Sequence, residues 1–551
     1  MQTIVSLLEE SCRHNSDRPA LSCKVAGSWQ NTSYADLWEL SGRIAAGMIK
    51  ADFKTGEHAA LLAPSSPHWV AAYLGILRAG GVVVPIDKEL KSSELQHILI
   101  DSDARFVFST AAVLDQLLET FPDLTAVELV ILFEPQVGLQ NRYTRTGRLI
   151  FLEAFCDSAE LPEILRTPHD TAVILYTSGT TGRSKGAMLS HDNIVSNILA
   201  AVKHFSLDGS IHTLSFLPIN HVFEQVCGVL LPLSLGGRIS FCESMKKLGE
   251  NLAEVRPTFF LAVPVVYRMI LDRITKKINS RKITRILFSV PLTRRLVTSK
   301  IQRAFGAGTI FISGGAALDP AIAEGMAAVG LTLYQGYGIT ETSPIISAEQ
   351  PGGTRLGTVG RLLEHVQLRI AKPNQEGVGE IQVKGPNVMQ GYYKNPHATA
   401  EVLSEGWYHS GDLGRLSPDG LLTICGRVKN LIVTPNGKNV YPEEVENELL
   451  KSPFIAEVMV YGHTVSAAEE VHAVIYPQQE ALDKHCLMAG NCPMSEVDVE
   501  ALLRVEVQRC CKQLADYKRV RKFTIREDEF PKTTTRKIKR FAVEASISTG
   551  S

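Results

Sequence analysis

Residues 176–186 have the types and spacing needed to bind a polyphosphate. Their sequence is YTSGTTGRSKG, and they follow a short apolar run at residues 172–176. Glycines let backbone N–H groups approach an anion, the hydroxyl groups donate hydrogen bonds, and Lys185 supplies positive charge. The segment is not a Walker P-loop, because Ser184 and Gly186 stand where that motif has glycine and a hydroxyl residue. The alternative interpretation is a flexible surface loop.

Four later segments carry further groups suited to a nucleotide site. Glu341 lies among hydroxyl groups and an aromatic ring in residues 337–343, YGITETS. Asp412 lies in WYHSGDLG, and Arg427 lies in GRVKN. Residues 531–540, PKTTTRKIKR, form a basic terminal loop. Taken singly, such segments also have ordinary interpretations as a helix cap, a β-turn or a solvated basic tail.

A run of basic residues without any acid extends over residues 273–306. Its ten cations are Arg273, Lys276, Lys277, Arg281, Lys282, Arg285, Arg294, Arg295, Lys300 and Arg303. Such a run usually forms the solvated face of helices. The alternative is peripheral contact with anionic lipid, where each surface Lys or Arg contributes about 1 kcal/mol.

Short apolar runs and helical patterns predict the elements that position the first loop. The predicted strands are at residues 58–63, 81–86, 104–108, 127–133 and 172–176. Between the first two strands, apolar residues recur at helical spacing: Trp69, Val70, Tyr73, Leu74 and Leu77. Another helix is predicted at residues 192–205. This alternation favours a sheet covered by helices.

After Gly353 the pattern changes to short strands and turns, and a domain boundary is predicted near Lys429. Beyond it we expect a helix starting at Pro442, strands near 458–461 and 471–476, and a helix near 496–514. Proline at the first helical position with glutamate beside it is a good start signal. The predicted domains are therefore a body of residues 1–428 and a small α+β domain of residues 429–551.

Composition excludes several classes of protein. The chain has 551 residues, of which 45% are hydrophobic and 21% charged, as in an ordinary globular protein and unlike a disordered one. The 57 Lys and Arg balance 58 Asp and Glu, which gives no overall electrostatic case for nucleic acid. Scattered cysteines argue against a zinc site or a disulfide framework. With no signal-type start and no long apolar run, the predicted location is cytoplasmic, at most peripheral at a membrane.

Together, and in this order, the five polar segments resemble the adenylate-forming enzymes: acyl- and aryl-CoA synthetases, peptide-synthetase adenylation domains and luciferases. The resemblance runs from about residue 10 to residue 541. Within this superfamily the chain is most similar to long-chain fatty acid–CoA ligases. The supporting segments are SFLPINHVFE at 215–224, VRPTFFLAVP at 255–264, GPNVMQGYY at 385–393 and NGKNVYPEE at 436–444.

The resemblance implies an α/β multidomain fold. Its large N-terminal body would consist of two βα subdomains plus a β-barrel, followed by a small mobile α+β lid. It also implies two half-reactions. A carboxylate attacks the α-phosphate of ATP to give acyl-AMP and pyrophosphate, and the CoA thiol then displaces AMP to form a thioester. Both steps build charge at oxygen, so fixed hydrogen-bond donors and a Mg²⁺ ion should supply most of the catalysis.

Similarity to the family also assigns roles within the body. The β- and γ-phosphates would be held by Thr177, Ser178, Gly179, Thr180, Thr181, Gly182 and Lys185. Thr340 would contact the α-phosphate, and Glu341 would bind Mg²⁺. The adenine would stack on Tyr337 with Gly338, beside Gly315 and Ala316. The acyl pocket would be lined by His221, Val222, Val263 and Gly314, although His221 has a second interpretation as a core-packed histidine.

The remaining roles fall near the C-terminus. Asp412 would accept the ribose hydroxyls, and Arg427 would reinforce that contact. Lys537 aligns with the lysine that bridges the substrate carboxylate and ATP, a task suited to a compact ammonium. Lys429 aligns with the hinge about which the lid would rotate.

Two residues depart from the family pattern. Ser184 replaces the usual proline before the lysine of the first loop, and Arg536 replaces the usual glycine before the catalytic lysine. The first change could loosen the loop without removing a ligand. If the second reflects a shift in register, Lys539 takes the catalytic role.

Three hypotheses about function follow. The first is an ATP-dependent ligase that joins a medium- or long-chain fatty acid to CoA. The second keeps adenylation but uses an aryl or other small acid, or a carrier-protein thiol as acceptor. The third is a catalytically silent acyl- or nucleotide-binding protein. Retention of Thr340, Glu341, Asp412, Arg427 and Lys537 argues against the third.

Overall fold

The computed structural model describes residues 2–120, 127–134, 149–177, 183–306, 308–465, 468–489, 493–532 and 538–549. The chain divides into two compact units. Unit 1 comprises Met1–Gln367 and Val383–Tyr408, and unit 2 comprises Leu368–Gln382 and His409–Ser551. Of the residues predicted to act, Ser178, Gly179, Thr180, Thr181, Gly182 and Lys537 lie outside the described residues.

The first sheet of unit 1 has eight strands in the order β19-β9-β8-β4-β3-β5-β6-β7. The strands are β3 (His58–Leu62), β4 (Val82–Pro85), β5 (Ala104–Ser109), β6 (Leu129–Leu132), β7 (Leu149–Phe151), β8 (Thr171–Thr177), β9 (Lys185–Ser190) and β19 (Gly391–Tyr392). From β8 to β7 the neighbours are parallel, whereas β9 is antiparallel to both β8 and β19. The five strands predicted from apolar runs are confirmed.

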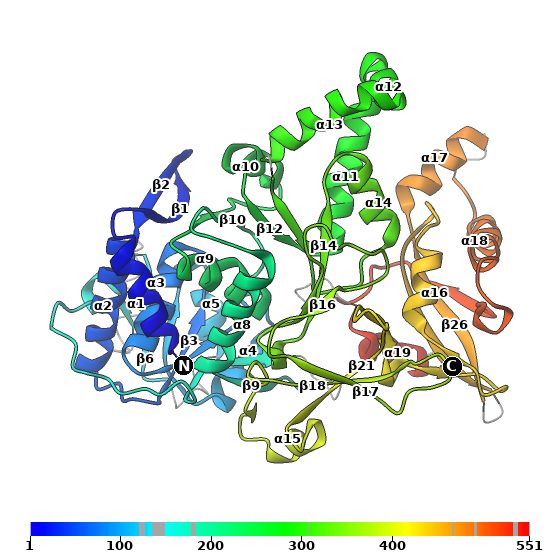
Figure 1. Cartoon of the computed structure of the whole chain (residues 1–551). Helices are drawn as coiled ribbons and strands as arrows, with labels where there is room; N and C mark the ends of the chain where they lie inside the picture. Colours follow the sequence, from blue (N-terminus) through cyan, green and yellow to red (C-terminus); the bar gives the residue numbers. More distant parts are fainter. Residues whose placement is uncertain are drawn as a thin grey trace. The chain divides into compact units, whose positions relative to one another are not determined.

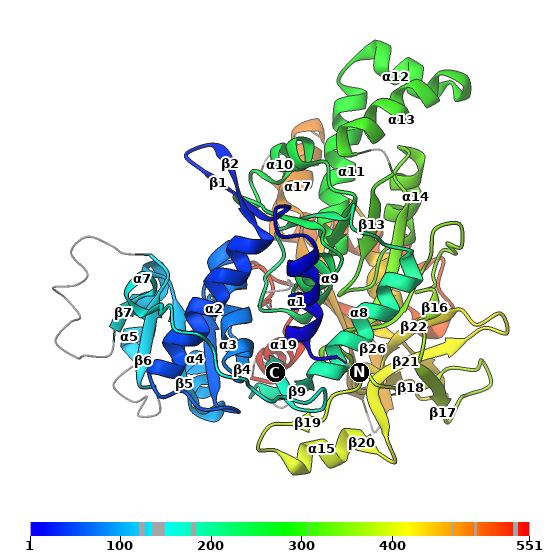
Figure 2. The same cartoon turned by 60° about the vertical axis from the view of Figure 1, so that its left-hand side comes forward.

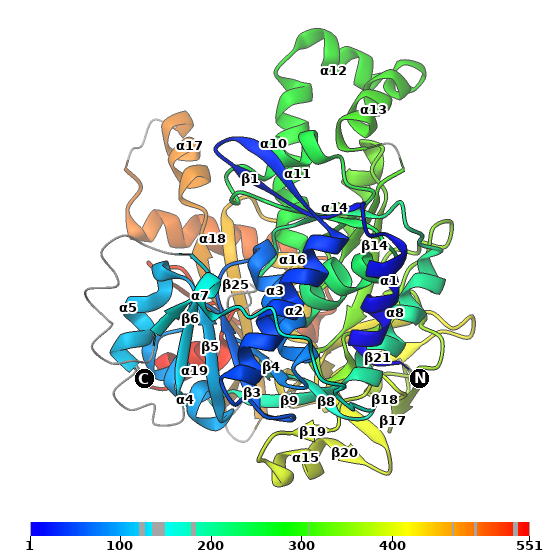
Figure 3. The same ribbon diagram turned by 90° about the vertical axis from the view of Figure 1, so that its left-hand side faces the viewer.

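Helices cover both faces of this sheet (Figure 3). On β3, Ala59 and Leu61 pack with α2 (Tyr34–Lys50) and α3 (Pro67–Arg78). The alternate residues Ala60 and Leu62 pack with α4 (Ser92–Asp101) and α5 (Ala111–Thr120). Successive side chains of a strand point to opposite faces, so a strand buried on both sides is apolar throughout. This is why these strands were recognisable as continuous apolar runs.

The second sheet of unit 1 has nine strands in the order β16-β15-β14-β13-β12-β10-β11-β1-β2. Their bounds are β1 (Pro19–Val25), β2 (Ser28–Ser33), β10 (His212–Ser215), β11 (Arg238–Phe241), β12 (Phe259–Ala262), β13 (Ile310–Ser313), β14 (Leu333–Gly338), β15 (Ile345–Ala348) and β16 (Arg361–Leu362). Strands β10 to β14 pair in parallel. Parallel pairing brings their carboxyl ends to one edge of the sheet, where ligands usually bind in such folds.

The helices of unit 1 begin at recognisable signals (Figure 1). Ser33, Ser66 and Ser190 cap α2, α3 and α8 by accepting hydrogen bonds from backbone N–H groups of the first turn. The predicted helix at 192–205 is α8 (His191–Phe205). The other helices are α1 (Ile4–His14), α7 (Leu152–Phe155), the π-helix η3 (Phe223–Leu230), α9 (Leu231–Ser234), α10 (Leu248–Val255), α11 (Pro264–Asn279), α12 (Lys282–Ser289), α13 (Pro291–Phe305), α14 (Pro320–Ala328), the 3₁₀ turn η4 (Thr340–Thr342) and α15 (Pro396–Val402).

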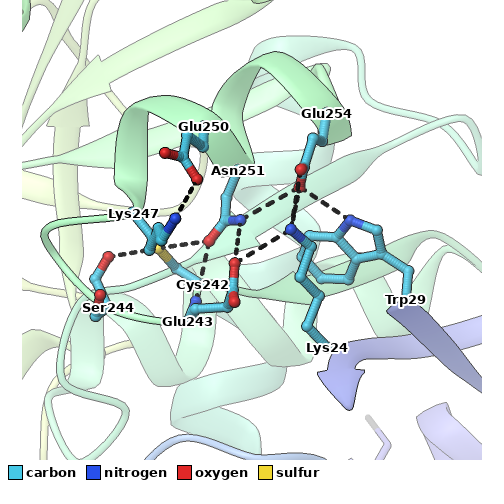
Figure 4. Close-up of polar contacts among 9 residues, drawn as sticks. All are labelled: Lys24, Trp29, Cys242, Glu243, Ser244, Lys247, Glu250, Asn251 and Glu254. Atoms are coloured by element: carbon cyan, nitrogen blue, oxygen red, sulfur yellow. Dashed lines mark hydrogen bonds and ion pairs between the residues drawn. The ribbon is translucent and has the colours of Figure 1, made fainter. Parts of the chain in front are cut away.

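A polar cluster ties the hairpin β1–β2 to α10 (Figure 4). Lys24 Nζ lies 2.7 Å from Glu254 Oε2 and 3.2 Å from Glu243 Oε2. The Trp29 indole donates to Glu254 at 3.1 Å, and the Asn251 amide donates to Glu243 at 2.8 Å. Contact with Glu254 raises the pKa of Lys24. The cluster joins segments more than two hundred residues apart and so closes one edge of the nine-stranded sheet.

Unit 2 contains most of a sheet in which β17 (Gln367–Ala371), β18 (Gly379–Lys384) and β21 (Trp407–Leu416) are successive neighbours. Strand β22 (Leu422–Arg427) pairs with β21, and β20 (Leu403–Ser404) pairs with the first two residues of β21. The resemblance predicts a β-barrel here. The described strands pair as a five-stranded sheet, and barrel closure stays a prediction.

The rest of unit 2 is a small α+β arrangement. Strands β25 (Ile455–Val465), β26 (Ala468–Pro477) and β27 (Lys522–Ile525) form one sheet, and β23 (Ile432–Val433) pairs with β24 (Asn439–Val440). The helical elements are η5 (Val428–Asn430), α16 (Pro442–Leu449), α17 (Gln479–Ala489), α18 (Glu496–Cys511), η6 (Asp516–Lys518) and α19 (Arg540–Thr549). The helix predicted at Pro442 and the two predicted strands are confirmed.

These elements bear on the remaining expectations from the sequence. The α/β class with a large N-terminal body is confirmed. The predicted boundary at Lys429 stays a prediction about where a lid would turn. Of the described cysteines, eight are free, whereas Cys486 is disulfide-bonded, a bond that the scattered cysteine spacing did not predict. No helix among the described residues combines the length and the hydropathy needed to span a bilayer.

Candidate active site

The predicted phosphate loop joins two antiparallel neighbours of the eight-stranded sheet. Strand β8 ends at Thr177 and β9 begins at Lys185. In the ladder Tyr176 faces Gly186, and Thr177 faces Lys185. The sheet therefore holds the hydroxyl residue and the lysine at the two ends of the loop opposite each other.

Helix α4 contacts both ends of this loop. The Tyr176 hydroxyl donates a hydrogen bond of 2.6 Å to Asp101, the last residue of α4. A ring nitrogen of His97 lies 3.1 Å from the carbonyl oxygen of Ser184. Burial, together with Asp101, raises the pKa of Tyr176, so this phenol stays protonated and remains a donor. Ser184, which departs from the family pattern, is thus contacted by His97 through its backbone carbonyl oxygen.

Two of the predicted motifs meet at Tyr392. Its hydroxyl donates to Glu341 Oε1 at 2.8 Å, and Lys185 Nζ lies 5.4 Å from the centre of its ring. Pairing of β19 with β9 places Tyr392 opposite Ala187, and the Met389 N–H donates to the Glu341 carbonyl at 2.9 Å. The structure therefore brings the lysine of the phosphate loop and the predicted metal ligand to one aromatic ring.

Tyr392 is a site residue that the sequence analysis did not single out. It lies in the GPNVMQGYY segment, which was used only as a mark of resemblance. Burial and the neighbouring Glu341 raise the pKa of Tyr392, so its hydroxyl stays a hydrogen-bond donor to the carboxylate. The available signal was a pair of tyrosines directly after Gly391.

The backbone around Glu341 has little freedom. A Cβ added at Gly338 would lie 2.0 Å from the Pro344 carbonyl oxygen, so only glycine fits there. Thr342 donates its hydroxyl hydrogen bond to the Ile339 and Pro344 carbonyls, at 3.1 and 2.8 Å. Glu341 is thus carried on a single fixed 3₁₀ turn, η4, directly after β14. Thr340 occupies the first position of that turn, and Tyr337 lies in β14.

The residues predicted to line the acyl pocket lie after neighbouring parallel strands. Val263 follows β12, and Gly314, Gly315 and Ala316 follow β13. A Cβ added at Gly314 would lie 2.9 Å from the Phe223 ring, and one added at Gly315 would lie 3.5 Å from Val263 Cγ1. The start of η3, the end of β12 and the end of β13 therefore come together.

His221 and Val222 precede η3 directly. The His221 carbonyl accepts a hydrogen bond from Gln225 N–H at 2.9 Å, and Val222 is buried. The predicted acyl pocket and the role of the His221 ring stay predictions. A π-helix at this point matches a common feature of functional sites, where an extra residue widens one helical turn.

Glu224 is a second residue whose importance the sequence did not reveal. It is 2% exposed, and its Oε1 has no hydrogen-bond partner among the described residues. A Cβ added at Gly228 would lie 2.8 Å from the Glu224 carboxyl carbon, so glycine provides the space for this group. Burial raises the pKa of Glu224 to about 8, opposed by the Ser215 hydroxyl. The carboxyl group is therefore mostly protonated at neutral pH.

In unit 2, Asp412 and Arg427 face each other across the β21–β22 ladder. The Arg427 Nε donates to Asp412 Oδ1 at 2.7 Å, and the Ser410 hydroxyl accepts from the Asp412 N–H at 3.0 Å. Asp412 is buried and Arg427 is half-exposed. The two residues form an ion pair, and their predicted contact with a ribose stays a prediction. Lys429 lies exposed in η5, two residues further along.

The base of the loop that carries Lys537 is built in unit 2. Lys532 and Ile538 form an antiparallel bridge, and the Lys539 N–H donates to the Pro531 carbonyl at 2.8 Å. Lys532 forms an ion pair with Glu457. Arg540 forms an ion pair with Glu446 and donates to the Val460 carbonyl at 2.8 Å.

Glu446 lies partly buried at this base, with its side chain 14% exposed. It accepts a hydrogen bond of 2.7 Å from the Val460 N–H as well as the Arg540 contact. Burial raises the pKa of Glu446, and Arg540 acts in the opposite direction. A guanidinium that also bonds a backbone carbonyl satisfies several donors at once, which suits a partly buried ion pair.

The chemistry of the donor set can be compared with the predicted Mg²⁺. Among the described residues, no three His, Cys, Asp or Glu side chains gather as a metal cluster. Mg²⁺ in nucleotide sites ordinarily takes one or two carboxylates, with waters and phosphate oxygens completing its shell. Glu341 on its fixed turn, with the Tyr392 hydroxyl donating to Oε1, fits that single-carboxylate role.

The two-sheet α/β body and its glycine-rich and acidic motifs define an adenylate-forming enzyme. The chain belongs to the AMP-binding enzyme family, whose model matches residues 8–393.

Curated relatives and solved structures agree with this assignment. The chain is 30% identical over 509 residues to long-chain-fatty-acid–CoA ligase ACSBG1 of Homo sapiens, covering 84% of this chain and 69% of the relative. It is 28% identical over 586 residues to long-chain-fatty-acid–CoA ligase FadD15 of Mycobacterium tuberculosis, covering 98% and 95%. ATP-bound MatB from Rhodopseudomonas palustris superposes with a TM-score of 0.78 at 27% identity, covering 99% of each chain. The anthranilate CoA ligase AuaEII shares the fold, with a TM-score of 0.79 at 21% identity over 100% and 98% of the two chains.

Proposed function

We propose that this protein is an ATP-dependent fatty acid–CoA ligase that favours a medium- or long-chain acid. The observation that supports it best is the meeting of Lys185 and Glu341 at Tyr392, because it joins the predicted pyrophosphate and metal groups. Family membership and the names of the long-chain relatives support the choice of acid and of CoA.

In the first half-reaction a carboxylate oxygen of the acid attacks the α-phosphorus of ATP. The bond from this phosphorus to the bridging oxygen breaks, and pyrophosphate leaves with the electron pair. Lys185 would neutralise the leaving pyrophosphate, and Thr340 would donate to the α-phosphate. Lys537 would hold the two anions together. Charge develops on oxygen in this step, so preorganised donors lower the barrier directly.

In the second half-reaction the CoA sulfur attacks the acyl carbon. The carbon–oxygen bond to phosphate breaks, AMP leaves, and the thiol proton passes to solvent. Asp412 and Arg427 would keep hold of the ribose, and rotation about Lys429 would carry Lys537 away before CoA enters. The Gly314–Val263 region would hold the acyl chain.

Mg²⁺ is part of the proposal. When bound, it would neutralise phosphate charge and polarise the phosphoryl oxygens. Glu341 would hold it from the protein side, with Tyr392 fixing the carboxylate orientation through Oε1. Glu341→Gln should therefore lower the rate more than it weakens nucleotide binding, because the metal also arrives with ATP.

A second ligase function remains as an alternative: adenylation of an aryl or other small acid, or transfer to a carrier-protein thiol. The likeness of the fold to an anthranilate CoA ligase favours keeping it. The proposed location is the cytoplasm, in peripheral contact with a membrane, because the proposed acid partitions into lipid.

The main test measures acid-dependent pyrophosphate release across acids from acetate to palmitate, with benzoate included. Thioester formation with free CoA is measured in parallel. Release and thioester formation that peak at a medium- or long-chain acid support the proposal. A peak at benzoate or acetate would move the function to the alternative ligase, and release without thioester would exclude CoA as acceptor. No release with any acid would overturn enzymatic function.

A second test separates the phosphate loop from its surroundings. Lys185→Ala should weaken ATP binding far more than AMP binding, because its charge is assigned to the leaving phosphates. Arg183→Ala is the matched control, since Arg183 is an exposed cation two residues away. Equal weakening of ATP and AMP by Lys185→Ala would exclude the loop as the pyrophosphate site.

A further inference from the structure

Helices α12 and α13 form a hairpin at the far end of α11, away from the nine-stranded sheet of unit 1 (Figures 1 and 2). Neither helix contains a fully buried residue. With the last turns of α11 they make up the basic hairpin, residues 273–305. A helical hairpin this exposed must be stabilised by a few contacts on one side, and the other side is open to a partner.

The apolar residues of the basic hairpin fall into two groups. Phe288, Val297, Ile301 and Phe305 are partly buried and pack against the core formed with α11 and α14. A second group is strongly exposed: Ile283 at 73%, Ile286 at 61%, Leu292 at 88% and Leu296 at 69%. The first group fixes the hairpin to the body, so the second group is not needed for that contact.

The spacing of the exposed group places its members in stripes. Ile283 and Ile286 are three residues apart on α12, and Leu292 and Leu296 are four residues apart on α13. Residues three or four apart lie on one face of a helix. Clustered exposed apolar side chains on a soluble fold mark an interaction surface rather than ordinary surface variation.

The cations of the basic hairpin lie beside these apolar residues in the sequence of both helices. All ten are exposed, and no carboxylate among the described residues lies within ion-pair distance of any of them. Elsewhere in the chain, cations such as Lys24, Lys532 and Arg540 are paired with glutamates. The surface therefore combines uncompensated positive charge with exposed leucine and isoleucine.

We propose that the basic hairpin docks on the surface of an anionic lipid bilayer. Ile283, Ile286, Leu292 and Leu296 enter the interface between headgroups and acyl chains, and the surrounding Lys and Arg contact lipid phosphates. Amphipathic helices with apolar residues on one face and Lys or Arg on the other lie in that interface. A nucleic acid would use the charges but would gain nothing from the leucines. A second copy of the chain would bring ten like charges against ten.

The hairpin is connected to the predicted acyl pocket by one helix. Helix α11 begins at Pro264, next to Val263 of that pocket, and ends at Asn279. Its sixteen residues span about 24 Å at 1.5 Å per residue. This part of the inference rests on the proposed function: a docked hairpin would hold the pocket a helix length from the lipid that contains its acid.

The test is flotation of the full chain with vesicles of phosphatidylcholine, with and without phosphatidylglycerol. The wild-type protein should float with the anionic vesicles and much less with phosphatidylcholine alone, and added salt should weaken binding. L292S with L296S should lower vesicle affinity at least tenfold. Replacing Lys282, Arg285, Arg295 and Lys300 by Gln should lower it about a hundredfold to a thousandfold.

The matched control is V497S with V505S on α18. These valines are also exposed on a helix, at 76% and 61%, but their neighbours include Glu496, Asp498 and Glu500. The control should bind vesicles like the wild-type protein. Thermal unfolding of every variant is measured first, and only variants that unfold like the wild type are compared.

Several outcomes would overturn the inference. Equal binding to both kinds of vesicle would remove the role of the cations. Undiminished binding of L292S with L296S would remove the role of the apolar stripes. In a third outcome, the wild-type protein binds no vesicles and forms an oligomer that L292S with L296S converts to a monomer. That result would show that this face is a contact between two copies of the chain.

Membrane docking can be tested separately from the proposed ligase function. Vesicle binding needs neither ATP nor CoA, so it can succeed if the ligase assignment fails. The hairpin variants should keep wild-type pyrophosphate release with a water-soluble short-chain acid and lose it only with vesicle-embedded long-chain acid. Loss with both acids would show that the hairpin acts on the catalytic body, which would overturn a docking role.

Discussion

The two loops that carry the predicted lysines, one in each unit, have bases of different chemistry. The phosphate loop of unit 1 ends on a strand ladder, a Tyr176–Asp101 hydrogen bond and a His97 contact to a backbone carbonyl. The Lys537 loop of unit 2 ends on two ion pairs, Lys532–Glu457 and Arg540–Glu446. The first base depends on sheet geometry, and the second depends on charge. Perturbations of charge should therefore separate them.

The largest expected effect is on the loop of unit 2 itself. Lys537→Ala should slow acyl-adenylate formation by about 10²–10³, the usual loss for one preorganised contact to developing charge. Thioester formation from supplied acyl-AMP should stay largely intact, because the lid would have moved the lysine away. Both half-reactions are measured separately, with Lys539→Ala as control. Equal losses in the two steps would exclude Lys537 as the adenylation lysine. A strong effect only in Lys539→Ala would assign that role to Lys539.

One carboxyl group in each unit extends the comparison. Glu446 of unit 2 is paired with Arg540, whereas no ion pair joins Glu224 of unit 1 to a cation of the described part of the chain. For Glu224, the folded pKa of about 8 exceeds the ordinary value, so the unfolded state loses the proton first as pH rises. Stability should therefore fall as pH increases from about 4.5 to 8, by about 3 kcal/mol at pH 7.

Glu224→Gln should remove that pH dependence and stabilise the protein at pH 7 by a similar amount. Urea unfolding at pH 5 and pH 8 measures it, with Glu250→Gln as an exposed control. An unchanged pH slope in Glu224→Gln would show that this carboxyl group is already ionised in the folded protein.

The next effect concerns the ionic base of the Lys537 loop. Arg540→Met should destabilise unit 2 by about 2–3 kcal/mol, less than for a fully buried pair because the Arg540 side chain is 21% exposed. Hydrogen exchange of the β25 and β26 amides measures this loss. Arg521→Met, at an exposed position before β27, should have little effect. If the two variants behaved alike, the ion pair would not support the loop.

The smallest effect concerns the hydrogen-bonded base of the phosphate loop. Tyr176→Phe removes a hydrogen bond to the Asp101 carboxyl group and should cost about 1.5 kcal/mol of unfolding free energy. Added salt should leave this loss unchanged, whereas it should weaken the exposed part of the ionic base in unit 2. Tyr393→Phe, which removes a hydroxyl bonded to Asp103 at 2.9 Å, is the matched control. A strong salt dependence of the Tyr176 variant would contradict the contrast between the two bases.

Much of the fold could be predicted because its signals are local. Strands buried on both faces are continuous apolar runs, and α3, which is buried at every residue from Trp69 to Leu77, is correspondingly rich in apolar residues. The division into units could not be derived in the same way. It depends on contacts between distant segments, and these leave no periodic pattern in the sequence.

The same limit applies to the candidate site. Hydroxyl and glycine residues marked the predicted phosphate loop. Resemblance assigned Asp412 and Arg427 to the ribose but did not predict the hydrogen bond between them. Tyr392, which joins two motifs, is 51 residues from Glu341, and His97 is 87 residues from Ser184. The burial of Glu224 depends on space left by Gly228 in a π-helix, which a residue list does not reveal.

The register of β8 and β9 has a consequence for the entropy of the phosphate loop. Because Thr177 pairs with Lys185, the ladder already holds the two ends of the loop together. The packing of the sheet therefore offsets the entropy lost in closing the loop. Lengthening a closed flexible loop adds only about 0.6 kcal/mol for each doubling. Insertions between Thr177 and Lys185 should therefore leave the fold stable while abolishing nucleotide binding. At this hairpin, the sequence that stabilises the protein and the sequence predicted to bind the nucleotide are free to vary separately.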